Sequence, residues 1–348
     1  MMNRPRKVTS RQVASLAGVS QTTVSFVLNN VESAGISEET RQRVMEAART
    51  LNYVPVTAAQ ALVRGRSSTI ALVLARPHRQ IFIDEFLPKI LTGISEVTQQ
   101  HGFRVMVELV GAEQLSAVYS GLLRSKEAAG VITTMGATNP TELQSILDCA
   151  AAGLPLVALN YLHPEVYSVE VDRLAGVKAI VEHLIALGHR RIACIPYADS
   201  RSNPYLAKRL DIYRATLAAA GIAIDDALIH PGDYDPETGY RAALTLLDQQ
   251  PRPTAIFAMN DVMAFGALRA IRERGGRVPE DVAVVGFDDV RLAAFSDPPL
   301  TTINEPDIEQ GRRAAEMLLT LIHGAVPEMR HVALATQLIV RQSCGASS

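Results

Sequence analysis

Two patterns of apolar residues divide this chain. Up to about residue 52, apolar side chains recur at the i, i+3, i+4 spacing of short amphipathic helices. From residue 69 onward, short apolar runs alternate with longer amphipathic segments, which is typical of buried parallel strands joined by helices. The sequence therefore predicts a small all-helical N-terminal domain followed by a larger α/β part.

The first pattern predicts two short helices joined by a tight turn over residues 8–30. Thr9 and Gln12 have the spacing of a capping box, and Ser20 is a favourable N-cap for the second helix. Gly18 can adopt the left-handed conformation that ends a helix. The apolar positions expected to pack together are Val13, Leu16 and Ala17 on the first helix, and Val24, Val27 and Leu28 on the second.

A third helix is expected to cover the first two. Ser37 is its predicted N-cap, and Asn52 and Pro55 mark its end. Its apolar stripe is Val44, Ala47, Ala48 and Leu51. The three helices together predict a compact helix-turn-helix headpiece.

Phe26 determines how the second helix is interpreted. It lies roughly 200° around the helix from Val24, so it points outward if Val24 is in the core. The side chains expected around it are small or form hydrogen bonds: Gln21, Thr22, Ser25 and Asn29. Such a surface suits a helix in the major groove of DNA, where amides contact base edges and apolar groups contact thymine methyls. The alternative is an ordinary helical hairpin, with Phe26 packed against the third helix or a dimer partner.

Charge favours the first interpretation. Residues 1–66 carry a net charge of +5, whereas the rest of the chain carries −7. Only the N-terminal part therefore has the electrostatics expected of a domain that binds a polyanion. With 48% hydrophobic and 20% charged residues, we expect a folded protein. Three widely spaced cysteines predict a reducing, cytoplasmic location, and no apolar run is long enough to span a membrane.

The second pattern predicts two doubly wound parallel sheets in tandem. Expected strands are 69–75, 103–110, 129–135, 154–160, 168–172, 188–196, 227–231, 254–260, 281–289, 300–304 and 331–340. Expected helices are 85–101, 113–124, 140–152, 207–220, 236–249, 261–274 and 307–323, with another that follows residue 172 and ends at Leu187. No phosphate-binding loop, metal-ligand spacing or nucleophile–base arrangement is evident, so neither a cofactor, nor a metal, nor an enzymatic activity is predicted.

The chain resembles the LacI/GalR family of bacterial transcriptional regulators along its whole length. The headpiece motifs are VTSRQVASLAGVSQTTVSFVLN, ISEETRQRVMEAARTLNYVP and AAQAL before GRSSTIALVL. The later motifs are GHRRIA, GDYDPETGY, RPTAIFAMNDVMAFGALRAI, VPEDVAVVGFDD and PPLTTIN. Phe26 and Val56 depart from the residues usual in the family. The resemblance implies a repressor that binds a palindromic operator as a homodimer, with no membrane partner.

By the same resemblance, residues 1–55 are the DNA-binding headpiece, 56–68 the hinge helix and linker, and 69–348 a periplasmic-binding-protein-like domain for effector binding and dimerisation. Lobe one of that domain would comprise about 69–170 and 305–334, and lobe two about 171–304 and 335–348. Leu62 matches the hinge leucine that wedges into the minor groove. The predicted DNA-contacting residues are Thr9, Ser20, Gln21, Thr22, Ser25, Phe26, Asn29 and Leu62. Because no heptad pattern follows Arg341, we expect a dimer rather than a tetramer.

The effector is expected to bind between the two lobes, at the carboxyl ends of the strands. The predicted effector-binding residues are Phe86, Asp172, Asn203, Tyr205, Arg209, Tyr234, Asn260 and Asp288. Capping is the alternative for Asp288, and packing for Phe86; Asp84 is a weaker candidate, and Asp261 is expected to cap a helix instead. A sugar or sugar derivative is the effector that the family implies, and a nucleobase or another small metabolite is the alternative. A transporter's binding protein or an enzyme on the same fold would lack operator binding.

Overall fold

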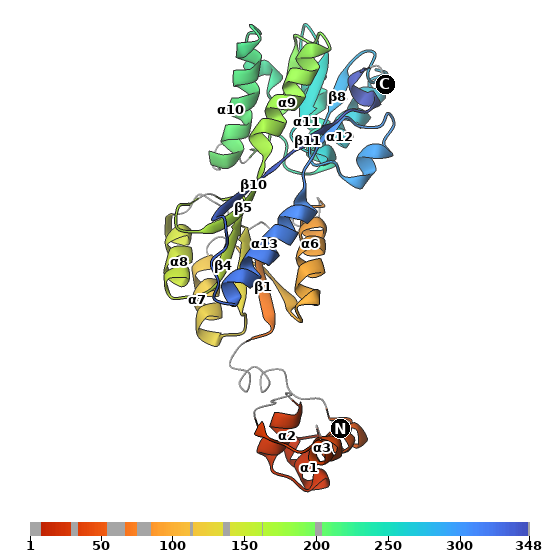
Figure 1. The fold of residues 1–348 in the computed structure, drawn as a ribbon. Helices are drawn as coiled ribbons and strands as arrows, with labels where there is room; N and C mark the ends of the chain where they lie inside the picture. Colours follow the sequence, from red (N-terminus) through yellow and green to blue (C-terminus); the bar gives the residue numbers. More distant parts are fainter. Residues whose placement is uncertain are drawn as a thin grey trace. The chain divides into compact units, whose positions relative to one another are not determined.

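The computed structural model describes residues 8–28, 34–53, 67–74, 85–111, 114–134, 140–161, 163–198 and 204–346 of the 348-residue chain. The chain divides into two compact units, Met1–Ser68 and Thr69–Ser348 (Figure 1). The first unit is all helical, and the second contains the sheets. This mixed α/β architecture with an N-terminal helix-turn-helix unit agrees with the fold class expected from the sequence.

The headpiece consists of α1 (Ser10–Ala17), α2 (Gln21–Leu28) and α3 (Glu38–Thr50). The Gln12 side chain accepts a hydrogen bond from the Thr9 backbone N–H at 2.9 Å. Gly18 has φ +67°, so it ends α1 in the left-handed region, as predicted. The Ser37 side chain accepts a hydrogen bond from Thr40 N–H at the start of α3. These local signals position the helices because each satisfies backbone groups that the helix ends leave unpaired.

The headpiece core confirms the predicted apolar stripes, with one exception. Its buried residues are Val13, Ala14, Ala17, Val24, Val27, Val44, Ala47 and Ala48, with Leu28 and Leu51 packed against them. The prediction for Leu16 is wrong, because its side chain is 55% exposed. Ala14 takes the place of Leu16 in the core, because the face of α1 that packs against α2 and α3 carries Val13, Ala14 and Ala17.

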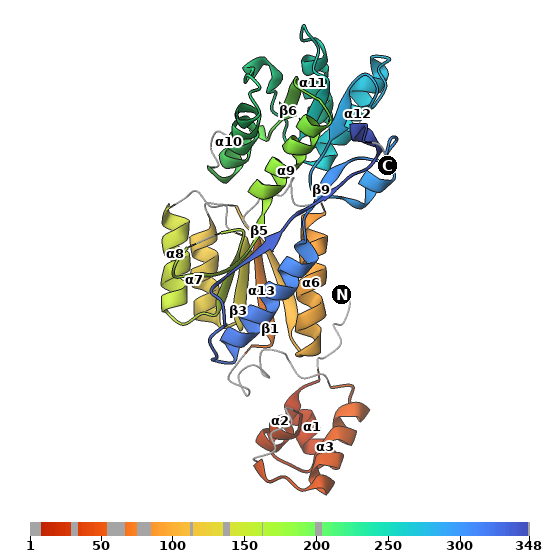
Figure 2. The ribbon, with the colours of Figure 1, turned by 45° about the horizontal axis from the view of Figure 1, so that its top comes forward.

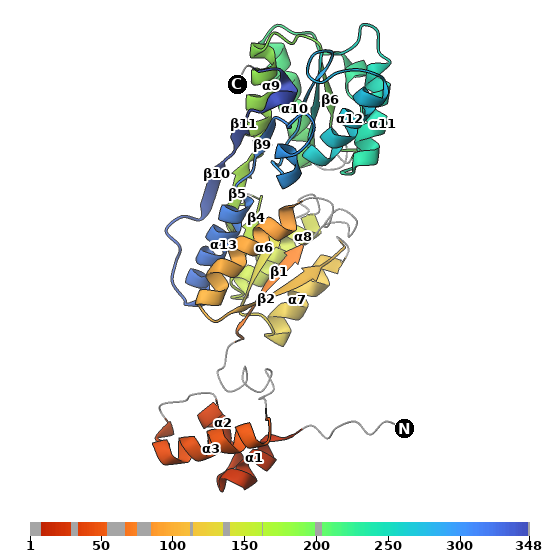
Figure 3. The ribbon, with the colours of Figure 1, turned by 90° about the vertical axis from the view of Figure 1, so that its right-hand side faces the viewer.

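Lobe one of the second unit is built on a six-stranded parallel sheet in the order β10-β5-β4-β3-β1-β2. Its strands are β1 (Thr69–Leu74), β2 (Arg104–Leu109), β3 (Gly130–Thr134), β4 (Leu156–Leu159), β5 (Tyr167–Asp172) and β10 (His331–Ala335). Helices α6 (Phe86–Gln100) and α13 (Asp307–Ile322) cover one face, and α7 (Leu115–Ser125) and α8 (Pro140–Ala151) cover the other (Figure 3). The central strands β1, β3 and β4 are buried on both faces, which explains their nearly continuous apolar sequences, whereas the edge strands β2 and β10 are partly exposed.

Lobe two contains a three-stranded parallel sheet in the order β6-β7-β8. The strands are β6 (Ile192–Ile195), β7 (Ala255–Ala258) and β8 (Ala283–Val285). Helices α9 (Arg173–Ala186) and α10 (Pro204–Ala219) lie on one side, and α11 (Pro236–Leu247) and α12 (Asp261–Glu273) on the other (Figure 3). One apolar cluster runs through this lobe.

Three stretches of chain connect the lobes (Figure 2). The chain passes from β5 to α9, returns from β9 (Thr302–Asn304) to α13, and passes back from β10 to β11 (Gln337–Ile339). The prediction of one strand over 331–340 is therefore wrong: β10 belongs to the lobe-one sheet, and β11 pairs antiparallel with β9. The break falls at Thr336, whose hydroxyl donates to the Asp172 carbonyl at 3.2 Å.

The strand predicted near 227–231 is also absent from the described structure. A short 3-10 turn, η4 (Asp226–Leu228), occupies its first half, and the remainder forms only an isolated bridge from Ile229 to Cys194. Asp225 explains the difference, because its side chain accepts a hydrogen bond from Ala227 N–H at 3.0 Å and stabilises a turn.

Candidate DNA-reading face and effector site

Helix α2 carries four of the eight residues predicted to contact DNA. Gln21 and Thr22 are exposed, and Ser25 is half-buried. Ser20 caps the helix, since its Oγ accepts a hydrogen bond from Thr23 N–H at 3.0 Å. Thr9 is exposed at the start of α1. The exposed polar side chains at the start of α2 are therefore free to meet a partner surface.

Phe26 is half-buried. Among the described residues, the hydrophobic side chains packed against the headpiece core are Val19, Leu28, Ile36, Leu51 and Tyr53, and Phe26 is not one of them. Its role in reading bases stays a prediction. Four of the predicted residues lie outside the described residues: Asn29, Leu62, Asn203 and Asp84.

Arg209, on α10, is the centre of the predicted effector site. Its side chain is 3% exposed, and its guanidinium lies 4.2 Å from the centre of the Phe287 ring and 5.3 Å from that of Tyr197. Nη2 donates to the Met259 carbonyl at 3.1 Å, but Nε has no hydrogen-bond partner within the described part of the chain. Burial disfavours the charged guanidinium, yet interactions with Tyr197 and then Glu305 outweigh it and raise the pKa of Arg209. Arg209 is therefore a buried cation with one donor that no described residue satisfies.

Tyr234 lies beside Tyr197 rather than alone. The two rings stack with centroids 4.1 Å apart and planes 21° apart, and the Tyr197 hydroxyl donates to the Met259 carbonyl at 2.7 Å. Tyr197 was not among the predicted site residues. The only sequence signal for it is its place just after β6, in IACIPY, where a strand ends. One face of the Tyr234 ring is thus covered by protein.

Asn260 both caps α12 and leaves a donor unused. Its Oδ1 accepts a hydrogen bond from Met263 N–H at 2.7 Å, while its buried Nδ2 has no partner in the described structure. The prediction that Asp261 is the cap is therefore wrong. Asp261 is fully buried and accepts hydrogen bonds from Thr302 Oγ1 at 2.6 Å and Val290 N–H at 2.9 Å. Burial raises its pKa to about 7.

Asp288 and Tyr205 complete the side of the site that lobe two contributes. Asp288 follows β8 in a left-handed conformation, φ 109°, and its N–H donates to the Ile303 carbonyl at 2.9 Å. Its negative charge contributes to the raised pKa of both Arg209 and Tyr197. Tyr205 is half-buried on α10 and contributes to the raised pKa of Arg209 and of Arg173. The structure thus groups three of the predicted residues, Arg209, Tyr234 and Asp288, around Tyr197, and places Tyr205 beside Arg209.

The remaining two described candidates have structural roles. Asp172 is exposed and caps α9, accepting a hydrogen bond from Ala175 N–H at 3.0 Å. Phe86 is 8% exposed and belongs to the apolar core of lobe one. These contacts neither require nor preclude an effector, so their assignment as effector-binding residues stays a prediction.

A buried ionic cluster lies where the chain passes between the lobes. Arg173 Nε donates a hydrogen bond to Glu305 at 2.8 Å, and Arg173 Nη2 forms an ion pair with the same carboxylate. Nη2 also lies 3.5 Å from Asp307 Oδ1. Arg173 Nη1 donates to Asn160 Oδ1 at 2.6 Å. The charge of Glu305 also contributes to the raised pKa of Arg209. Sequence reasoning missed this cluster, since Arg173 and Glu305 are 132 residues apart in the chain.

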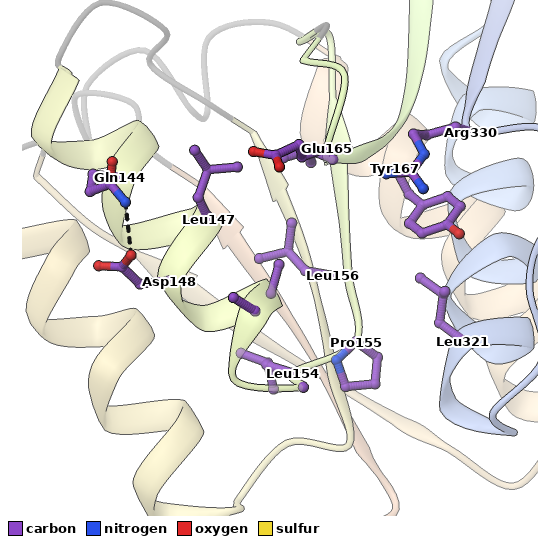
Figure 4. Close-up of a pocket in the computed structure, with 14 residues that line it drawn as sticks. Gln144, Leu147, Asp148, Leu154, Pro155, Leu156, Glu165, Tyr167, Leu321 and Arg330 are labelled. Carbon is purple, nitrogen blue, oxygen red and sulfur yellow. Dashed lines mark hydrogen bonds between the residues drawn. The ribbon is translucent and has the colours of Figure 1, made fainter.

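A surface pocket of about 720 Å³ lies elsewhere, within lobe one (Figure 4). It is lined by the carboxyl-terminal half of α8, the residues that lead into β4 and β5, and Leu321 and Arg330. Figure 4 shows Tyr167 and Arg330 on one side and Leu147 and Asp148 on the other. None of the predicted effector residues within the described part of the chain lines it. Among the described residues, no cluster suits a metal ion, and no helix could span a membrane.

Comparison with known proteins agrees with both parts of the structure. Residues 9–56 match the model of bacterial regulatory proteins of the lacI family, and residues 181–344 match a periplasmic binding protein-like domain. The chain is 36% identical over 346 residues to the transcriptional regulator CelR of Thermobifida fusca, covering 98% of this chain and 100% of the relative. It is 33% identical to the repressor CytR of Escherichia coli, covering 97% and 96% of the two chains.

Solved structures give the same result. A CelR–cellobiose complex matches with a TM-score of 0.70 and 34% identity, covering 97% of this chain and 100% of that one. A lac repressor dimer bound to operator and an anti-inducer matches with a TM-score of 0.83 and 29% identity, covering 98% and 100%. A helix-turn-helix headpiece, a two-lobed core and relatives that are regulators rather than enzymes lead to one conclusion: the chain belongs to the LacI family of bacterial transcriptional regulators.

Proposed function

We propose that this regulator is a repressor that binds a palindromic operator as a homodimer. Its affinity for the operator falls or rises when a small effector binds between the two lobes. The observation that carries the proposal is the pairing of two features in one chain. A positively charged headpiece exposes Gln21 and Thr22 on α2, and a core unit gathers buried, partly unsatisfied polar groups around Arg209. The first suits DNA, and the second suits a small polar ligand.

The unused donors support a carbohydrate effector. Arg209 Nε and Asn260 Nδ2 are buried donors without partners in the described structure, and such groups are costly unless a ligand satisfies them. Sugar hydroxyls accept hydrogen bonds and also donate to carboxylates such as Asp288. The relative CelR has been solved in complex with cellobiose. A β-glucoside or related sugar is therefore the first effector class to test.

A nucleobase is the second candidate, favoured by the tyrosine pair. The stacked rings of Tyr197 and Tyr234 provide an aromatic surface, and planar bases stack on such surfaces. Relatives with 30% identity include the repressor PurR of Vibrio atlanticus. Within the proposed site, Tyr234 would contact the base, and Arg209 and Asn260 would meet its ring acceptors.

Exposed apolar side chains on lobe two support self-association. Phe295 and Leu292, which lie at and beside the short helix η5 (Arg291–Ala294), are 83% and 65% exposed. Large apolar side chains grouped on a surface mark interaction sites, and a two-fold dimer matches a palindromic operator. We place the working dimer in the reducing cytoplasm, which suits three free, buried cysteines.

A gel-shift titration of the full chain tests the proposal. Binding of a palindromic operator with two-protomer stoichiometry, altered by either cellobiose or a purine, is the expected result. A matched duplex with one scrambled half-site is the control, since it retains the phosphates but loses one set of base contacts. Equal affinity for both duplexes would contradict sequence-specific operator binding.

A further inference from the structure

Helix α6 of lobe one contacts the chain of lobe two beside Asp288. Lys89 Nζ donates to the backbone carbonyls of Asp288 and Asp289, at 2.9 and 3.3 Å. One turn earlier, the Glu85 carboxylate accepts from Arg291 N–H, with both oxygens at 3.2 Å. The N-cap residue and the first turn of α6 thus contact residues 288–291, which we call the 288–291 turn.

The 288–291 turn is held firmly on its own side. Asp261 accepts from Val290 N–H at 2.9 Å, and Asp289 accepts from Asn304 at 3.0 Å and from Arg341 at 2.7 Å. Asp288 and Asp289 both have positive φ, 109° and 48°, a conformation that non-glycine residues keep only when their surroundings fix it. Lobe two therefore presents the two carbonyls to Lys89 as a preformed acceptor pair.

The Lys89 contact is directed at the turn and not merely at its helical neighbour. The Lys89 ammonium lies 4.0 Å from the Glu85 carboxylate, farther than from either carbonyl, and its side chain is 17% exposed. A cation that is mostly removed from water forms stronger hydrogen bonds than an exposed one. Its charge also reaches the buried Asp261, where it favours the ionised form. Lys89 thus joins lobe one to the backbone of a predicted effector residue.

We propose that Lys89 is a positioning residue of the effector site, which acts through the 288–291 turn to hold the lobes together and Asp288 in place. The part of this inference that concerns ligand affinity rests on the proposed effector site, whereas the part that concerns the lobes does not. Loss of the Lys89 contact separates the lobes in the absence of any ligand. Because lobe one is then no longer held against the turn that carries Asp288, the effector binds less tightly.

Distance measurements between spin labels test the lobe contact without an effector. Labels are placed on full-length protein at Gln99→Cys on α6 and Ala218→Cys on α10, two exposed positions, while the native cysteines are buried. Lys89→Met keeps the length of the side chain and removes its charge. We expect it to add a longer-distance population that the parent lacks, and Lys89→Arg to restore the parent distribution.

Lys178→Met is the matched control, since Lys178 lies on α9 in an exposed pair with Glu182, and its distribution should equal that of the parent. If Lys89→Met folds poorly, Lys89→Gln, which retains a donor, should show a smaller shift in the same direction. A parent-like distribution for the folded Lys89→Met or Lys89→Gln variant overturns the proposal.

Calorimetry with cellobiose tests the positioning of Asp288. We expect Lys89→Met to weaken binding about tenfold, as loss of a charged hydrogen bond would, with Lys89→Arg close to the parent and Lys178→Met unchanged. Separated lobes with parent-like cellobiose affinity would overturn the positioning role. If the parent does not bind cellobiose, the sugar proposal fails, and the distance measurement alone decides whether Lys89 holds the lobes.

Discussion

The interiors of the two lobes and the junction between them are built from different chemistry. Each interior is almost entirely apolar, with fully buried strands such as β3 and β7. The junction instead buries charge: Arg173, Glu305 and Asp307 are all less than 10% exposed where the connecting segments meet. An apolar interior tolerates only one packing arrangement well. A junction held by directional polar contacts can exchange one set of partners for another, which is what a regulator with two states requires.

The largest expected effect comes from breaking the junction's ion pair. Arg173→Met leaves Glu305 and Asp307 buried without their cation, and removal of one partner of a buried pair costs about 3–5 kcal/mol of unfolding free energy. Interactions with Glu305 outweigh burial and raise the pKa of Arg173, so Arg173 is fully charged in the parent near neutral pH. Urea denaturation measures the change.

Arg312→Met provides the matched control. Arg312 pairs with Glu96 between α13 and α6, but the two side chains are 36% and 48% exposed, and exposed pairs contribute about 0–1 kcal/mol. Equal losses for the two variants would contradict the distinction between the junction and the surface.

This contrast also explains what the sequence could and could not predict. Periodicity located nearly every helix and strand of the lobes, because burial on one or both faces leaves a pattern within a single segment. It joined β10 and β11 into one strand, since a run of alternating residues does not reveal that its halves enter different sheets. It missed Tyr197, Arg173 and Glu305 because their roles arise only where distant segments meet. Asp288 was predicted from its place at the end of an apolar strand together with the family resemblance, and Arg209 from the resemblance.

The effector side of the junction gives the next prediction. Asp288→Ala should weaken effector binding by about 2–3 kcal/mol, because buried donors of the ligand lose their acceptor. Operator affinity without effector should change little. Calorimetry with the identified effector measures the effector affinity. Asp211→Ala serves as the control, since Asp211 is exposed on α10. Parent-like affinity of the Asp288→Ala variant would show that the effector binds elsewhere, for instance in the pocket of Figure 4.

Asp261 makes the stability of lobe two depend on pH. Burial raises its folded pKa to about 7 from the usual 3.8, so the folded protein holds this proton more tightly than the unfolded chain does. The resulting stability is fully present below the unfolded pKa and is lost as pH rises through about 7. Between pH 5 and pH 7, the parent should lose up to about 1.4 kcal/mol per pH unit relative to Asp261→Asn.

Denaturation at several pH values, with both proteins compared at each, measures this difference. Asp281 is a suitable contrast, because its hydrogen bond with Arg277 lowers its pKa to about 2. That contribution is present above the unfolded pKa and is lost only in acid, so the difference between the parent and Asp281→Asn should be constant from pH 5 to pH 8. A pH-independent difference for Asp261→Asn would mean that the carboxyl is ionised throughout.

The smallest expected effect lies in the headpiece and concerns base preference. Phe26 cannot form strong hydrogen bonds, so it cannot select guanine as arginine does, but it can pack on a thymine methyl. Phe26→Ala should relax a preference for thymine over cytosine at the facing half-site position by roughly 1 kcal/mol. The salt dependence of operator binding should be unchanged, because no phosphate contact is lost. If the exposed Arg11 contacts phosphate, Arg11→Ala should instead weaken binding to all DNA sequences and make the affinity less dependent on salt.

Binding selection on randomised half-sites, combined with headpiece melting, separates this role from simple packing. If Phe26 packs against α3 or a partner protomer, Phe26→Ala lowers the melting temperature and leaves base preference intact. Its half-buried side chain is compatible with a partial contribution to stability, so the two readouts must be taken on the same variant. A base preference that survives in a normally folded Phe26→Ala headpiece would assign the reading of that position to Gln21 or Thr22, the exposed polar residues at the start of α2.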